Sequence, residues 1–184
     1  VPPSGLRVVS EKNGVRRELA FIPQASPGYL HSFGLTRRYV VMLTQPFNFN
    51  LAKFLSPDRG PIITNYEWHP ELPSQIILVD RKRGGVVKTF DTEAFFAFHH
   101  INAYEKGDKV IVDVCAHNDA GVIDALYLKR IRKDHDVPQA RYRRFEVNPS
   151  NGKLSKRDLI DAVIELPQKN YDAVNGRHYR YAYG

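Results

Sequence analysis

Short runs of apolar, aromatic and β-branched residues alternate with clusters of glycine, proline, asparagine and aspartate along most of this 184-residue chain. Runs of this length, bounded by turn-forming residues, are typical of β-strands. The pattern predicts strands over residues 6–10, 15–22, 29–36, 39–44, 74–79, 86–90, 95–104, 109–115, 141–147 and 153–154, with further strand-like runs at 163–167 and 179–184. Their near-regular spacing favours an all-β sandwich, barrel or propeller.

The connections between these runs support the same fold class. Asn13-Gly14, Gly84-Gly85 and Gly107 separate pairs of predicted strands, and glycine readily adopts the positive φ that tight hairpins need. Residues 46–61 hold three prolines and predict a long connection rather than a strand. Residues 123–133 alone show a helical pattern, and an imperfect one. Helix is therefore expected to be scarce, which argues against Rossmann and TIM-barrel folds.

The length of 184 residues indicates one domain or part of one. The chain opens at Val1 without an initiator methionine and closes on Tyr179–Gly184, a run typical of a strand that has just begun. We therefore expect residues 1–184 to form a single partial domain, truncated at both ends. The one cysteine, Cys115, lies in an apolar run, which predicts a buried thiol in a reducing compartment.

The formal net charge of +7 narrows the choice of partners only slightly. Basic residues occur in short clusters such as Arg37-Arg38 and Arg81-Lys82-Arg83, several of them at predicted turns. No recognition helix, zinc finger or single-strand-binding motif accompanies them, so nucleic acid is not an expected partner. A weak attraction to acidic lipid head groups requires no motif and is favoured over nucleic-acid binding, while solvated charge without a partner is the default interpretation at such turns.

Candidate chemistry begins with two adjacent histidines, His99 and His100, in the aromatic run Phe98–Glu105. Imidazole is the commonest protein ligand for a mid-row divalent metal. The alternative is a core strand with one buried, hydrogen-bonded histidine. His31 lies far upstream on another predicted strand, and wide spacing does not exclude a shared site, because separate propeller blades can each contribute a ligand. The histidines alone leave both interpretations open.

Three runs stand out together: Tyr29-Leu30-His31-Ser32-Phe33-Gly34-Leu35-Thr36, Phe98-His99-His100-Ile101-Asn102-Ala103-Tyr104-Glu105 and Glu165-Leu166-Pro167-Gln168-Lys169-Asn170-Tyr171. They resemble signatures of the carotenoid cleavage oxygenases, the family that includes the β-carotene oxygenases and the retinal pigment epithelium isomerase. The intervals between them also match, and Tyr179–Gly184 is similar to the family's Tyr-x-Tyr-Ala-Tyr-Gly run. The resemblance covers essentially the whole chain and depends on the combination of runs.

This resemblance implies part of a seven-bladed β-propeller with one Fe(II) per intact protein on its axis, held by four histidines. His31 matches the second family ligand and His99 the third, while the motifs of the first and fourth lie outside this chain. Family members with a single histidine at this place keep it directly after the phenylalanine, which favours His99 over His100. Successive strand side chains face opposite sides, so His100 is expected to pack behind the site. His69, His117, His135 and His178 lie in no ligand motif of the family.

Two further roles follow from the same resemblance. Glu165 matches a glutamate that holds the second ring nitrogen of the third histidine, so we expect it to bind His99. The alternative is a surface carboxylate, although the apolar setting of Glu165 would make an unpaired charge costly. Tyr29 matches an aromatic residue that lines the substrate tunnel in related proteins, with ordinary packing as the alternative.

The matches imply a non-haem Fe(II) dioxygenase that uses O2 as co-substrate to cleave a carbon–carbon double bond of a carotenoid or apocarotenoid, giving aldehyde or ketone products. The alternatives are a dioxygenase of stilbene-type double bonds and a propeller-derived binding or scaffold module without catalysis. We expect a cytoplasmic protein that associates peripherally with a membrane to reach its insoluble substrate. Because two of four ligands hold Fe(II) weakly, the isolated 184-residue chain is expected to be inactive.

Overall fold

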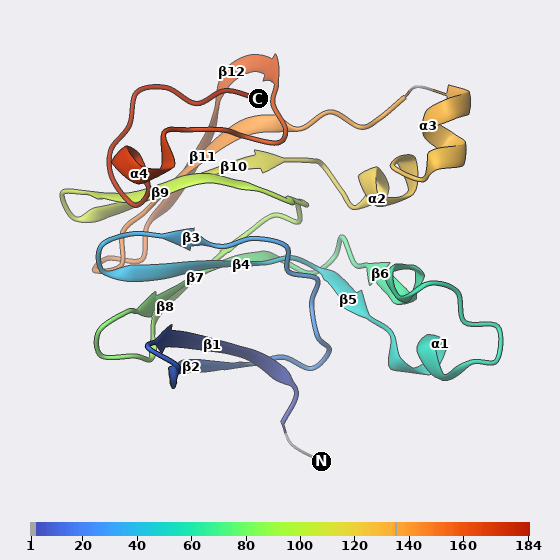
Figure 1. Ribbon diagram of the computed structural model, residues 1–184, viewed down its shortest axis with the longest axis horizontal. Coiled ribbons are helices and arrows are strands. Elements are labelled where there is room, and N and C mark those ends of the chain that lie inside the picture. Colours follow the sequence, from blue (N-terminus) through green and yellow to red (C-terminus); the bar gives the residue numbers. More distant parts are fainter. Residues whose placement is uncertain (1–2, 135) are drawn as a thin grey trace.

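The computed structural model describes residues 3–134 and 136–184, and strands dominate it (Figure 1). The strands are β1 (Gly5–Lys12), β2 (Val15–Pro23), β3 (Gly34–Leu35), β4 (Tyr39–Thr44), β5 (Phe47–Phe49), β6 (Tyr66–Trp68), β7 (Ser74–Asp80), β8 (Val86–Thr92), β9 (His100–Lys106), β10 (Lys109–Ala116), β11 (Arg141–Val147) and β12 (Leu154–Val163). Short helices lie in the connections: α1 (Leu51–Leu55), the 3-10 helix η1 (Ile62–Asn65), α2 (Gly121–Ala125), α3 (Leu128–Asp134) and α4 (Tyr171–Val174). The all-β prediction is confirmed.

Two four-stranded antiparallel sheets form the body of the molecule, with strand orders β3-β4-β7-β8 and β12-β11-β10-β9. Within each of these sheets the strands pair in sequence order, and β5 and β6, which lie between β4 and β7 in sequence, pair with each other separately. The β1–β2 hairpin lies beside the first sheet (Figure 1). Four-stranded antiparallel sheets are the units from which propeller blades are built. The two sheets therefore have the form of successive blades.

A shared apolar core holds the two sheets together. Val41, Ile76 and Leu78 of the first sheet belong to one buried cluster with Val112 and Phe145 of the second. Full burial of one such side chain stabilises the fold by roughly 1.5–3 kcal/mol. The relative position of the sheets is therefore set by the packing of many side chains rather than by any single bond.

β4 is buried along its whole length because both of its faces are covered. Side chains alternate across a strand, so Val41 and Leu43 face the core between the sheets. Val40 and Met42 instead pack under the β1–β2 hairpin. The hairpin thereby closes the outer face of the first sheet, and β4 lies at the centre of the structure.

The segment after β12 covers the outer face of the second sheet. Ile164 and Tyr179 from this segment pack against Ile101, Ile111 and Cys115. Cys115 is buried, as the sequence predicts. Burial, together with the charge of Glu165, raises the pKa of its thiol to about 12. Cys115 is therefore a protonated packing residue rather than a reactive thiolate.

A fully buried carboxylate, Asp113 of β10, ties this C-terminal segment to the sheet. Its cross-strand partner Arg144 donates from Nε and Nη2 to the two carboxylate oxygens, each at 2.8 Å. The hydroxyls of Tyr142 and Tyr179 donate to the same carboxylate. Burial and the Asp113 charge raise the pKa of Tyr142 to about 12, so its hydroxyl stays a donor. One buried anion thus joins β10, β11 and the chain beyond β12.

The prediction of a strand over residues 29–36 is wrong for most of its length, since only Gly34–Leu35 forms β3. Ser32 replaces the missing ladder contacts with its hydroxyl. Ser32 Oγ donates to Phe98 O at 2.7 Å and accepts the His100 N–H at 2.9 Å. Side-chain bonds of this kind compete with regular ladders. His31 therefore lies in an irregular segment ahead of a strand rather than at the head of one.

The predicted strand over residues 95–104 likewise begins late, at His100. Ahead of it, Phe96 forms an isolated antiparallel bridge with His117. The side-chain amide of Gln45 binds both the N–H and the carbonyl of Ala97. These bonds satisfy backbone polar groups without a regular ladder, and His99 lies in the irregular segment that enters β9, with its carbonyl accepting the Cys115 N–H at 3.0 Å.

Further segments differ from the sequence pattern. Residues 46–61 contain β5 and α1 rather than an unstructured connection, because Asn50 Oδ1 caps α1 by accepting the Lys53 N–H at 2.9 Å. The predicted helix at 123–133 is split into α2 and α3. Residues 179–184 form no strand among the described residues and pair only through a bridge between Tyr183 and Gln168.

We expect Asp113→Ala to lower the free energy of unfolding by about 3–5 kcal/mol, because it leaves the Arg144 guanidinium without its partner in a largely buried site. Urea denaturation followed by circular dichroism measures the change. Asp161→Ala is the matched control, since Asp161 pairs with Arg141 at 2.9 Å while 98% exposed, and it should have little measurable effect. Equal changes in the free energy of unfolding would show that the buried Asp113 network stabilises the fold no more than an exposed ion pair does.

Candidate metal centre

His31 and His99 lie together although they come from different sheets. The segment before β3 carries His31 and the turn before β9 carries His99, and these two strands are neighbours in space (Figure 1). The imidazole centroids are 5.0 Å apart and the ring planes are nearly perpendicular, at 89°. Ser32 contributes to this placement because its hydroxyl bonds join the two segments. The structure thus brings the two predicted ligands to one place.

Each of these rings has its Nδ1 engaged by an oxygen. His99 Nδ1 is 2.6 Å from Glu165 Oε2, and His31 Nδ1 is 3.1 Å from the Tyr29 hydroxyl. In the tautomer with the proton on Nδ1, each ring donates to its oxygen and keeps the Nε2 lone pair free. An oriented imidazole of this form is what metal sites use. The pair therefore offers two neutral nitrogen donors.

Glu165 accepts hydrogen bonds from three donors. Besides His99, His117 Nε2 donates to Oε1 at 2.9 Å and the Leu166 N–H donates to Oε2 at 2.9 Å. Burial raises the pKa of the Glu165 carboxyl, but the bonds from His117, His99 and Leu166 outweigh it, and the pKa is lowered overall. Glu165 is therefore a carboxylate that holds two imidazoles, and the expected contact with His99 is present.

The backbone at this place is strained. Leu166 has φ of 50°, a left-handed conformation that side chains other than glycine rarely adopt. Such outliers persist where surrounding contacts determine the conformation, and they occur often at functional sites. Here the Leu166 N–H is directed to the Glu165 carboxylate, so the strain is associated with the residue that orients His99.

His100 is half-buried, and its Nε2 is enclosed by protein. Its Nδ1 is 3.0 Å from Ser32 Oγ. Burial, followed by the charges of Lys169 and His99, lowers the pKa of His100 to about 4. A neutral ring held by Ser32 with its Nε2 enclosed agrees with the expectation that His99 rather than His100 faces the site, while metal binding by His99 itself stays a prediction.

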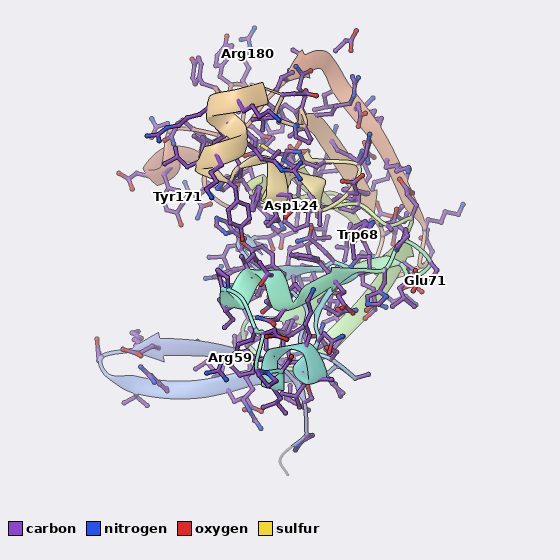
Figure 2. All side chains as sticks on the ribbon, turned by 90° about the vertical axis from the view of Figure 1, so that its right-hand side faces the viewer. Arg59, Trp68, Glu71, Asp124, Tyr171 and Arg180 are labelled. Atoms are coloured by element: carbon purple, nitrogen blue, oxygen red, sulfur yellow. The ribbon has the colours of Figure 1, made fainter. Side chains whose placement is uncertain are left out.

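An apolar cavity of about 490 Å³ lies beside the two histidines, and both rings line it. Its walls include Val122, Leu126, Val137, Pro138 and Val163. Figure 2 shows the end of the molecule that carries α2 face-on, with Asp124 of α2 labelled. A larger cavity of about 680 Å³ is lined by arginines and polar groups and contains neither histidine. The smaller cavity is therefore the one connected with the candidate chemistry.

Tyr29 does not appear among the described residues that line this cavity. Its ring packs against Phe47, Tyr66 and Phe96, at centroid distances of 5.7–5.8 Å. Burial and the neighbouring Tyr66 raise the pKa of its hydroxyl, which therefore stays protonated next to His31. Tyr29 contributes to the site through His31, and a direct contact with substrate stays a prediction.

Sequence reasoning assigned no role to His117, which the structure places on Glu165. A histidine directly after the largely buried strand β10 is a weak signal that could have been used, because a buried ring needs a polar partner. His69 pairs with exposed Glu71, and His178 packs on the Tyr104 ring. His135 lies outside the described residues.

The donor set fits a mid-row divalent metal such as Fe(II), since both candidate ligands are neutral imidazoles with engaged Nδ1 atoms. Among residues 3–134 and 136–184, no group of three or more His, Cys, Asp or Glu side chains is placed to hold a metal ion. The chain by itself therefore offers a pair of ligands, and any further ligands would have to come from elsewhere.

Comparisons with known proteins point to one family, and the matches extend over most of the chain. Residues 2–184 match the family described as retinal pigment epithelial membrane protein. The chain is 36% identical over 168 residues to the carotenoid isomerooxygenase of Galleria mellonella, which covers 85% of this chain and 33% of that protein. It is 31% identical over 159 residues to the apocarotenoid-15,15'-oxygenase of Synechocystis sp., with 85% and 32% covered. The chain spans about a third of the length of these relatives.

The same correspondence is seen in three dimensions. The crystal structure of cobalt-substituted Synechocystis ACO superposes with a TM-score of 0.77 at 27% identity, covering 91% of this chain and 34% of that chain. Carotenoid oxygenase structures of this kind are β-propellers, of which this chain covers only part. The predicted fold class, an incomplete propeller, is confirmed.

Glu165→Ala should lower metal affinity by about 10- to 100-fold, the usual effect of removing a group that orients a ligating imidazole. Competition with a chelator, with Co(II) as the probe, measures this in the whole protein. Glu71→Ala is the matched control, because Glu71 forms an exposed pair with His69 at 3.2 Å, and it should leave affinity unchanged. Unchanged affinity in the Glu165 variant would remove its assigned role.

Proposed function

This chain belongs to the retinal pigment epithelial membrane protein family, and from that premise we propose that the whole protein is a non-haem Fe(II) dioxygenase. Its reaction is cleavage of a carbon–carbon double bond in a carotenoid or apocarotenoid. One atom of O2 enters each of the two carbonyl products, so no other oxidant is needed. The relatives named above support an oxygenase of carotenoid substrates. The observation that carries the proposal is the pair of oriented imidazoles, 5.0 Å apart, on one apolar cavity.

Within this proposal three residues, His31, His99 and Glu165, have definite tasks. His31 and His99 hold the metal through Nε2, and Glu165 keeps the His99 ring in the tautomer and orientation that this requires. An Fe(II) ion held by these imidazoles would supply the activation of O2. The chain needs no acid or base for this reaction, because cleavage of a double bond by O2 transfers no proton.

The cavity has the character expected for a polyene. Aliphatic side chains and a phenylalanine provide most of its wall, and its polar side chains are the imidazoles, the Glu165 carboxylate and Gln139. Apolar walls bind an apolar chain by removing its surface from water and keep water away from the reacting bond. The cavity of about 490 Å³ represents the portion of the site that this chain supplies.

We propose further that the protein is cytoplasmic and meets a membrane surface through the segment that joins α2 to α3. Leu126, Tyr127 and Leu128 are exposed there in succession, and Leu126 also lines the cavity. The basic residues of α3 follow directly: Lys129, Arg130, Arg132 and Lys133. Apolar residues beside a basic cluster suit anionic lipid head groups. None of the described helices has the length and apolar character needed to cross a bilayer.

The proposed activity predicts that the whole protein contains iron and converts β-carotene or an apocarotenoid to aldehydes or ketones, detected by chromatography. His99→Ala should abolish both the bound iron and the products, because it removes one ligand. His178→Ala is the control, since that ring packs on Tyr104 away from the cavity. The isolated 184-residue chain should give no product.

A parallel incubation with a hydroxystilbene separates the alternatives. Cleavage of the stilbene with intact carotenoid would favour a stilbene dioxygenase. Recovery of both substrates intact from an iron-loaded preparation would overturn the oxygenase proposal and leave a binding or scaffold module.

The proposed membrane contact predicts that Leu128→Ser weakens sedimentation with phosphatidylserine vesicles by several-fold, because it removes an apolar side chain from the bilayer interface. Leu55→Ser on α1 is the control, as Leu55 is 67% exposed and Leu128 59%. Binding should also fall with added salt. Equal binding of both variants and the unaltered protein would place the membrane contact elsewhere.

A further inference from the structure

His117 follows the last residue of β10 and its ring is held in place by packing. The residue is 2% exposed. Its backbone N–H donates to Phe96 O at 2.7 Å, and its carbonyl accepts the Phe96 N–H at 3.1 Å. The ring lies against the rings of Phe96 and Phe98, with centroids 6.3 Å and 5.9 Å away. The imidazole therefore has little freedom to change its direction.

The polar contact of this ring is with Glu165. His117 Nε2 is 2.9 Å from Glu165 Oε1. A carboxylate oxygen only accepts hydrogen bonds, so the proton of the neutral ring lies on Nε2. His117 Nδ1 is buried and has no partner among the described residues. A buried ring nitrogen without a hydrogen-bond partner lowers the stability of the fold. Stability alone therefore does not explain His117, and its bond to Glu165 is the contact to be explained.

The carboxylate of Glu165 needs such a fixed partner. The last torsion of a glutamate side chain has broad, roughly two-fold preferences, so bonds to Oε2 alone would leave the plane of the carboxylate loosely defined. His99 and Leu166 both bind Oε2, whereas His117 binds Oε1. With both oxygens held, Oε2 stays directed at His99 Nδ1. The His117 ring thus sets the orientation of the His99 ring through the Glu165 carboxylate.

We propose that His117 is a positioning residue for the metal site. It fixes the Glu165 carboxylate, and through it the Nδ1–H tautomer and the orientation of His99. This inference rests on the proposed function, because it assigns His99 to a metal. His117 is not itself a further ligand, since its Nε2 is bound to Glu165 and its Nδ1 is inaccessible. No carboxylate other than Glu165 pairs with its ring among the described residues.

The experiment compares two substitutions in the whole protein. His117→Phe keeps an aromatic ring between Phe96 and Phe98 but removes the donor. His117→Gln retains a donor, because it places an amide N–H close to the position of Nε2. We expect the phenylalanine variant to bind Co(II) about 10- to 100-fold more weakly in chelator competition, and the glutamine variant to recover most of this loss. The visible absorption of bound Co(II) should shift in the phenylalanine variant, since the His99 donor is no longer held in one orientation.

A double-mutant cycle distinguishes positioning from general destabilisation. Because His117 acts through Glu165, His117→Phe should cause no further loss of affinity in the Glu165→Ala background. Losses that add would overturn the proposal. His178→Phe is the matched control for a histidine-to-phenylalanine change outside the cavity. Thermal unfolding of the metal-free proteins shows whether the variants fold, and an equal loss of affinity in both His117 variants with lowered unfolding temperatures would also overturn it.

The outcomes separate this inference from the function on which it rests. If the unaltered protein binds metal and cleaves its substrate while His117→Phe binds Co(II) as tightly, the positioning role is wrong and the oxygenase proposal stands. If the unaltered protein binds no metal, both are wrong.

Discussion

The packing of one sheet on the other is the constraint on which the candidate site depends. His31 lies in the segment that leads into the first sheet and His99 in the segment that leads into the second, and no direct bond holds the two rings near each other. Val41 and Ile76 on one side and Val112 and Phe145 on the other form a continuous buried core. A strand whose side chains are buried on both faces, as in β4, needs a packed layer on each side of its sheet. The distance between the two imidazoles is therefore a consequence of core packing.

The candidate ligands lie in irregular segments directly before two of the strands. Regular ladders stop before β3 and β9, and the hydroxyl of Ser32 and the amide of Gln45 satisfy backbone groups that a ladder would otherwise use. This leaves short irregular segments whose side chains need not alternate strictly between two faces. Functional residues are commonly found in such segments when a rigid scaffold holds both of their ends. His31 and His99 occupy two of them.

Two carboxylates, the buried Asp113 and the half-buried Glu165, have different tasks in this chain. Asp113 is matched by one guanidinium and two hydroxyls, and it anchors the C-terminal segment on the second sheet. That segment carries Glu165, which is matched by two imidazoles and a backbone N–H. The first network is closed, whereas the second ends on His99 with a ring nitrogen free for a metal. The stability of the anchor thus supports the geometry of the site, because a displaced C-terminal segment would remove Glu165 from both histidines.

The sequence by itself determined the all-β class, most hairpins and the two histidine signatures, because alternation, turn glycines and short motifs are local properties of the chain. It also paired Glu165 with His99 through a family resemblance, and that contact is present. The irregular segments around His31 and His99 and the bridging role of His117 were decided by tertiary structure. They depend on hydrogen bonds between residues far apart in sequence, such as Ser32 with His100 and His117 with Glu165. Local patterns carry no record of such bonds, because each partner on its own is an ordinary polar residue.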